Sequence, residues 1–224
     1  IVIYDNVLPT AWEEAHGAGL SGGVKTVVGI GTSDNIAYRT PKFLGTEIQV
    51  AYAFDVGSTD TADKATGTGG TNNTTGRGYD ATIKINPSLG TEILSGLNLY
   101  AGASTIEVYA NSGLNEDKYE GVGAITYALG PVEVGAMWSG LYSGDETTVD
   151  AYHTYKNHGF GVAFNVNDDL SVSYGEYQTR KAGYTGDNAQ VTNDSGRVVE
   201  VTSWQAAYTM GGASFRVADV KADN

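Results

Sequence analysis

Residues 46–55 read TEIQVAYAFD and carry the clearest structural signal in the chain. Apolar and mostly polar or small residues alternate along this stretch. The first set is Ile48, Val50, Tyr52 and Phe54, and the second is Glu47, Gln49, Ala51, Ala53 and Asp55. Because successive side chains of a strand point to opposite faces, this pattern predicts a β-strand with one apolar face.

The same period of two recurs in nine further segments. They are residues 34–42, 78–86, 93–103, 117–128, 131–141, 154–166, 169–178, 199–210 and 212–220. Short links such as NPSLG and TMGGA alternate with long polar loops such as VGSTDTADKATGTGGTNNTTGR. This alternation of connection lengths predicts an all-β, antiparallel up-and-down fold with its long loops at one end.

Composition excludes several classes of protein. The 224 residues include no cysteine, so disulfides and thiolate metal sites are impossible. A net charge of −13 argues against nucleic acid as a partner, because phosphate contacts need lysine and arginine. No apolar run reaches the roughly 18 residues of a membrane helix.

The apolar faces of residues 48–54, 132–138, 160–166 and 170–174 carry no charged residue, and this absence is compatible with two kinds of fold. A lysine or arginine facing lipid near mid-bilayer costs about 2–4 kcal/mol, so a membrane barrel requires this absence. A β-sandwich would show the same alternation, but would bury Val50, Val134 and Val162 in a shared dry interior. Aromatic residues near the segment ends favour the interface girdles of a barrel. They are Tyr52, Phe54, Tyr127, Trp138, Tyr174 and Tyr208.

Four stretches resemble general porins of Gram-negative bacteria. Residues 34–54, DNIAYRTPKFLGTEIQVAYAF, resemble the porin segment N-x-x-x-Y-x-x-P-x-F-x-G and the strand that follows it. Residues 5–14, DNVLPTAWEE, resemble the Asp-x-x-Leu-Pro constriction loop and its acidic continuation. Residues 163–175 and 204–217, AFNVNDDLSVSYG and WQAAYTMGGASFRV, are similar to alphaproteobacterial members in particular.

The resemblance implies a transmembrane β-barrel of sixteen strands in the outer membrane of a Gram-negative bacterium. Such porins have short periplasmic turns and long external loops, assemble as homotrimers, and form water-filled passive diffusion channels for small hydrophilic solutes and ions. On this reading residues 1–224 are part of a single barrel domain. We expect residues 5–31 to form the constriction loop and residues 34–220 the strands and external loops. The ten segments then correspond to strands six to fifteen of a longer protein, with residues 1–4 ending strand five.

The resemblance also assigns roles at the pore constriction. Asp5, Glu13 and Glu14 would project into the lumen, Pro9 would stiffen the bend, and Trp12 would anchor the loop against the wall. Charged residues on the barrel wall would complete a transverse field across the aperture. Candidates for the lumen wall are Arg39, Glu47, Lys84 and Arg216. The carboxylates on the loop predict a weak preference for cations.

Two other kinds of function stay open on sequence alone. A soluble all-β surface or adhesin-type module could hold a ligand in its long loops. A barrel hydrolase would need a nucleophile beside a histidine, and of His16, His153 and His158 only His153, near Asp150, offers this. We interpret all three as loop or surface histidines, and predict no enzyme activity, catalytic residue, cofactor or protein metal site.

Expected partners are outer-membrane lipid and lipopolysaccharide. Carboxylates in the predicted external loops are candidates for divalent cations that bridge lipopolysaccharide. They are Asp60, Asp63, Asp145, Glu146, Asp187 and Asp194.

Overall fold

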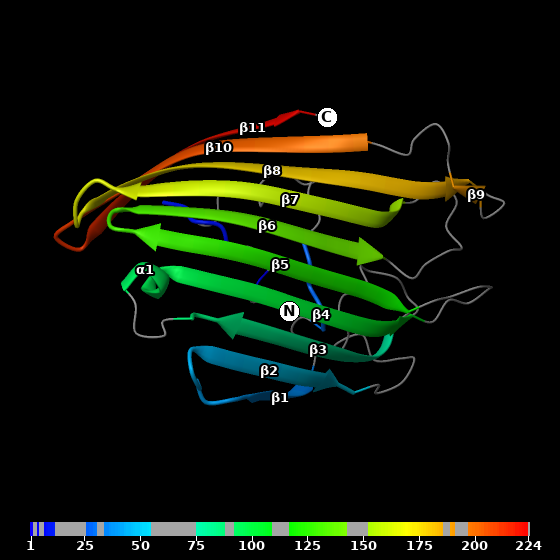
Figure 1. Ribbon diagram of the computed structural model, residues 1–224. Coiled ribbons are helices and arrows are strands. Elements are labelled where there is room, and N and C mark those ends of the chain that lie inside the picture. Colours follow the sequence, from blue (N-terminus) through cyan, green and yellow to red (C-terminus); the bar gives the residue numbers. More distant parts are fainter. Residues whose placement is uncertain are drawn as a thin grey trace.

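A single antiparallel sheet dominates the computed structural model. The structure describes residues 1, 4, 7–11, 26–30, 34–54, 75–87, 92–108, 117–142, 152–185, 189–190 and 197–223. The main strands are β1 (Asn35–Arg39), β2 (Thr46–Ala53), β3 (Thr75–Ile85), β4 (Leu97–Val108), β5 (Lys118–Leu129), β6 (Val132–Tyr142), β7 (Tyr152–Asn165), β8 (Leu170–Thr185), β10 (Arg197–Met210) and β11 (Ala213–Asp223). Each pairs antiparallel with its neighbour in the chain (Figure 1). The predicted all-β up-and-down fold is therefore confirmed.

β1 and β11 are the two edges of this sheet, so the described strands do not close into a barrel. Two small elements complete the description: the helix α1 (Glu92–Ser95) precedes β4, and the two-residue strand β9 (Ala189–Gln190) pairs with the end of β8. Among the described residues, no helix is long and apolar enough to cross a membrane.

Several predicted boundaries were wrong by a few residues. Residues 93–96 were predicted to begin a strand, but they lie in α1 and the turn that follows it. Gly96 ends this turn, and its carbonyl accepts the Ala128 N–H at 3.0 Å. A side chain at position 96 would meet the Ala128 carbonyl, so the backbone approach requires glycine. β4 and β8 extend to Val108 and Thr185, beyond the strand ends that we predicted.

The turns between β1 and β2, β5 and β6, β7 and β8, and β10 and β11 all lie at one end of the sheet, together with α1 (Figure 1). In the turn between β10 and β11, two glycines allow the chain to reverse within two residues. Gly211 and Gly212 have φ of 56° and 95°, and Met210 pairs directly with Ala213. Positive φ at both central residues is the condition for a type I′ hairpin.

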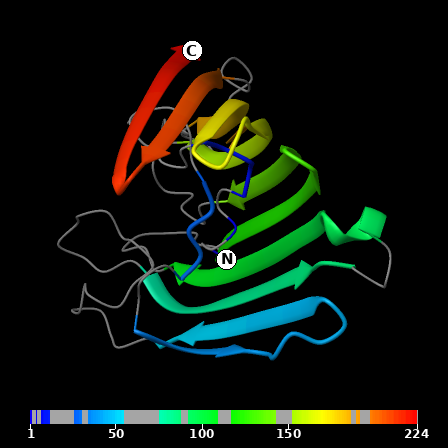
Figure 2. The ribbon, with the colours of Figure 1, turned by 90° about the vertical axis from the view of Figure 1, so that its left-hand side faces the viewer.

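The sheet curves, and its two faces differ in chemistry (Figure 2). On the convex face, Val50 and Val134 are 48% and 38% exposed, and the register places Val162 beside Val134 on the same face. These three side chains are not in a shared dry interior, as the sandwich alternative required. The concave face carries Asp80, Glu120 and other polar residues, mixed with apolar ones.

Residues from the N-terminal part of the chain lie inside the curve of the sheet (Figure 2). Ile1 and Tyr4 are buried against the concave face and belong to no strand, although we predicted the end of a strand there. Their environment explains the difference: Ile1, Tyr4, Leu8 and Val27 form one apolar cluster with side chains from the strands. The concave face beneath them is therefore partly apolar, because the contact has to exclude water to be stable.

Candidate functional site

The concave face is crossed by a segment that we call the inner segment, made of the described residues 1, 4, 7–11 and 26–30. It lies against side chains of the concave face and leaves part of that face covered. Its contacts extend from β3 to β8, and they are of three kinds: carboxylates that accept backbone N–H groups, apolar contacts, and close approach to glycines.

Glu120 on β5 is the first carboxylate anchor. Its Oε2 accepts the Gly29 N–H, its Oε1 accepts the Val28 N–H at 3.2 Å, and the Ser104 hydroxyl donates to Oε2 at 3.1 Å. The Lys118 ammonium lies 2.9 Å from Oε1. Glu120 is only 4% exposed, so its charge is stable there because it is paired and hydrogen-bonded.

Asp80 on β3 is the second carboxylate anchor. The backbone nitrogen of Ile1 donates to its Oδ2 at 2.8 Å, and the Ile30 N–H lies 3.3 Å from its Oδ1. Gly29, which precedes Ile30, adopts a φ of +60°. A Cβ at this position would collide with both Ile1 and Asp80. Glycine at position 29 therefore lets the backbone lie close to Ile1 and to the Asp80 carboxylate.

Tyr4 of the inner segment is held by an aromatic contact and a hydrogen bond. Tyr4 meets Tyr100 of β4 edge to face, with ring centroids 5.2 Å apart, and its hydroxyl hydrogen-bonds the Thr82 side chain. Burial raises the pKa of Tyr4, and the carboxylate of Glu47 adds to this effect. The hydroxyl therefore stays protonated at neutral pH.

A row of glycines on the concave face receives Leu8 and Pro9. Gly135 of β6 pairs with Gly161 of β7, which pairs with Gly175 of β8. A Cβ at Gly135 would lie 2.6 Å from Pro9 Cδ, and one at Gly161 would lie 3.0 Å from the Pro9 carbonyl oxygen. The missing side chains thus form a trough into which the inner segment fits. Beyond it, the Ala11 N–H donates to the Ser173 hydroxyl at 2.8 Å.

Filling this trough is expected to displace the inner segment. Gly135→Ala places a methyl group against the rigid Pro9 ring, and Gly135→Val adds more volume; overpacking of this kind costs about 1–3 kcal/mol. Proteolysis of the folded protein should cut the inner segment faster in both variants. Gly123→Ala is the matched control, because its Cβ would meet nothing closer than 4.0 Å. Equal protease resistance in all three variants would show that the trough does not hold the segment.

Of the predicted constriction residues, the structure describes only Pro9. Pro9 is buried in the glycine trough, and its predicted role of stiffening the bend of a constriction loop stays a prediction. Asp5, Trp12, Glu13 and Glu14 lie outside the described residues. The anchors Glu120, Ser173 and the glycine row were missed by sequence reasoning. One signal was available for Glu120: it is the only acid on a strand face otherwise made of Lys118, Val122, Ala124 and Thr126.

Three of the four lumen-wall candidates form one group on the concave face. Arg39 donates to Gln49 Oε1 from Nε and Nη2 at 3.0 and 2.8 Å, and its Nε lies 3.7 Å from Glu47. Glu47 pairs in register with Lys84, whose ammonium lies 5.2 Å above the Tyr100 ring. This patch neighbours Tyr4 of the inner segment through Tyr100.

Arg216, the fourth candidate, does not join this group. It faces inward on β11, at the opposite edge of the sheet from β1 (Figure 2). The two basic positions Arg39 and Arg216 therefore lie at opposite edges of the concave face.

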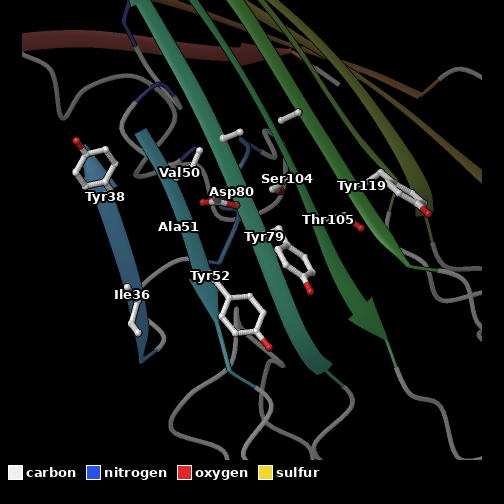
Figure 3. A pocket seen from close by; sticks show the side chains of 12 residues that line it. Ile36, Tyr38, Val50, Ala51, Tyr52, Tyr79, Asp80, Ser104, Thr105 and Tyr119 are labelled. Atoms are coloured by element: carbon white, nitrogen blue, oxygen red, sulfur yellow. The ribbon is translucent and has the colours of Figure 1, made fainter. Parts of the chain in front are cut away.

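The convex face carries a groove of about 710 Å³ over β1 to β5 (Figure 3). Ala81 and Ala103 are register partners that leave room between larger side chains, and tyrosines border the space. Two of these, Tyr52 and Tyr79, have ring centroids 5.0 Å apart. An exposed groove of this chemistry suits hydrocarbon better than water.

The histidines and the loop carboxylates bear on the alternatives of catalysis and metal binding. His158 is exposed on the convex face beside Trp138, whereas His16, the His153 side chain and the six loop carboxylates lie outside the described residues. Within the described part of the chain, no group of three histidine, aspartate or glutamate residues is arranged to hold a metal ion.

Comparison with known proteins supports the fold and leaves the sequence family open. No protein-family model and no curated protein matches the chain. Among solved structures, the outer membrane channel DcaP of Acinetobacter baumannii is similar with a TM-score of 0.64 at 14% identity, over 97% of this chain and 61% of that one. A porin refined at 1.8 Å gives 0.54 at 14% identity, over 85% and 56%. The chain thus spans less than two thirds of either neighbour, and the likeness is one of fold: an antiparallel sheet of the porin barrel type.

Proposed function

We propose that this chain contributes wall and constriction to an outer-membrane channel, through which small hydrophilic solutes and ions diffuse passively. The observation that carries the proposal is the division between the two faces: a convex face that is exposed and largely apolar over β1 to β6, and a concave face crossed by the inner segment. A wide barrel holds water unless something narrows it, so the inner segment would set the size of the aperture. No catalytic step is part of the proposal.

Conductance tests this function directly. The full-length protein, purified in detergent and added to a planar lipid bilayer, should produce stepwise ohmic current increments. Liposome swelling should show passage of small sugars and exclusion of larger ones. A soluble binding module, the alternative function, would stay in buffer without detergent and would give no current steps.

We further propose a weak cation preference, carried by Asp5, Glu13 and Glu14. In a potassium chloride gradient, the reversal potential should have the sign of potassium selectivity. Glu13→Gln with Glu14→Gln should move it toward zero, because two fixed charges leave the aperture. The matched control is Glu133→Gln, which removes an inner-face carboxylate near the turns. A reversal potential of the opposite sign in the unmodified protein would refute the preference.

A further inference from the structure

The groove on the convex face has a flat floor of small residues, which continues from β3 across β6 (Figure 3). The floor consists of two register rows, Ala81–Ala103–Gly121–Gly140 and, nearer the turns, Ala101–Gly123. Strands lie about 4.8 Å apart, and outward residues follow each other about 6.7 Å apart along a strand. The floor therefore measures roughly 14 by 7 Å.

Aromatic and aliphatic side chains border the floor, and only one end of the groove is polar. The border residues are Tyr52, Tyr79, Thr105, Tyr119 and Tyr142 on the side away from the turns, and Val50, Ile83, Leu99, Ile125 and Trp138 around the rest. Tyr52 and Tyr79 point their hydroxyls away from the turns (Figure 3). Beyond them, Arg77 Nε lies 2.5 Å from Glu107 Oε1. The polar end thus carries hydroxyls and one ion pair.

The position of the groove along the strands gives its depth in the proposed membrane location. Successive outward residues of a strand that is tilted by about 40° rise by roughly 5 Å. Counted from Leu97, Ala103 is the fourth outward residue of β4 and Glu107 is the sixth. They stand about 15 and 25 Å up, and the apolar band of a membrane barrel is about 25 Å tall. The floor therefore lies at the level of hydrocarbon, and the polar end lies at the headgroups.

The glycines of the floor are not required by the fold. A Cβ at Gly121 or Gly140 would meet nothing closer than 3.9 or 3.8 Å, and neither residue has a positive φ. Glycine weakens a strand, and in a strand interior it often marks a place that a ligand or another backbone approaches closely. Within the described part of the chain, no segment lies over the outer side of β3 to β6 (Figure 2). This leaves a ligand as the occupant.

The size of the groove suits a small molecule better than a protein. Its volume of about 710 Å³ lies within the range of roughly 300–1,000 Å³ for small-molecule pockets. Its 12 lining residues are fewer than the roughly 20–30 that each partner contributes to a specific protein interface. Its charge also restricts the ligand: Arg77 is paired with Glu107, so the polar end offers no net positive charge to an anionic headgroup.

We propose that this groove binds a rigid, uncharged polycyclic lipid, a fused aliphatic ring system with a hydroxyl at one end. A flat ring face contacts the whole floor, and dispersion attraction grows with the number of atoms in contact. A rigid ligand loses little conformational freedom on binding, whereas an acyl chain has to be straightened to follow the floor. The ring hydroxyl lies at the polar end, beside Tyr52 and Tyr79. This inference rests on the proposed membrane location, and it gives the outer wall a specific ligand.

Photolabelling tests the site. The full-length protein is reconstituted in phosphatidylcholine vesicles with one of two probes: a sterol that carries a diazirine in its rings, or a phosphatidylcholine that carries it on an acyl chain. After irradiation, mass spectrometry maps the adducts of each probe. The ratio of sterol to acyl-chain adducts should be at least about fivefold higher on β2 to β5 than on the other strands, because only the groove selects a rigid ligand. Excess cholesterol should abolish this difference.

Ala103→Leu fills the middle of the floor, and it should lower the sterol ratio on β2 to β5 to that of the other strands. The matched control is Ala206→Leu, on the outer face of β10 between Val172 and Val217. Both variants add the same apolar side chain to the convex face, so only the position differs. Protease resistance of the reconstituted barrel checks that both are folded.

Each remaining outcome contradicts a stated part of the proposal. An equal ratio on all strands, or a high ratio that Ala103→Leu leaves unchanged, overturns the polycyclic ligand and leaves the channel function intact. Absence of adducts with both probes, in protein that stays in buffer, overturns the proposed function as well.

Discussion

Glu120→Gln is expected to release the inner segment and increase single-channel conductance. Hydrogen bonds to a charged group contribute about 1.5–3 kcal/mol each, and this carboxylate accepts two from the segment, from Val28 and Gly29. A glutamine amide accepts at only one of its two ends, so at least one buried N–H loses its partner. A loss of about 3 kcal/mol raises the undocked population roughly a hundredfold. Bilayer recordings should then show larger or fluctuating conductance steps.

The control for this variant is Glu133→Gln, on the inner face of β6 beside Ala128. It removes the same charge from the same face, so an electrostatic effect on ion flow would appear in both variants. Only Glu120→Gln should change the step size for neutral solutes in liposome swelling. If the two variants admit the same solutes at the same rates, Glu120 does not hold a constriction.

The fold was predictable because a barrel wall repeats one simple rule. In β2 and in the first halves of β6 and β8 the period of two separates an apolar from a polar or small face, and a strand shifted by one residue would turn its polar face outward. Strand ends were less predictable. The alternation of residues 93–96 continues that of β4, so these residues were predicted as strand. The carbonyl of Gly96 instead accepts the Ala128 N–H, and the local sequence pattern does not predict this contact between distant residues.

Of the residues that contact the concave face, sequence reasoning named only Pro9, because it belongs to the motif DNVLPTAWEE. Glu120 and Gly135 were not named, because their roles depend on partners more than ninety residues away in the sequence, at Gly29 and Pro9. A glycine in a strand signals close backbone approach in general, but only the register shows that Gly135, Gly161 and Gly175 lie side by side.

Ala136→Lys is expected to destabilise the folded protein in bilayers by about 2–4 kcal/mol, the cost of a lysine on the lipid face near mid-bilayer. Ala136 is the third outward residue of β6, between Ile125 of β5 and Phe160 of β7 on the convex face. Denaturant titration of the full-length protein folded into lipid vesicles measures the loss. In a soluble module the same position would face water, and a surface substitution would change stability by about 0.5 kcal/mol or less.

Ala213→Lys is the control that separates the effect of membrane depth from the effect of introducing a lysine. Ala213 is the first outward residue of β11, beside the Gly211–Gly212 turn, so its lysine can reach the interface. The cost of a lysine on the lipid face falls to about 0–1 kcal/mol near the interfaces. The two alanines differ in strand and in height, but both change to lysine on the convex face. If Ala136→Lys proves as mild as Ala213→Lys, hydrocarbon does not contact β6 at mid-height. The apolar convex face would then need another explanation than a membrane.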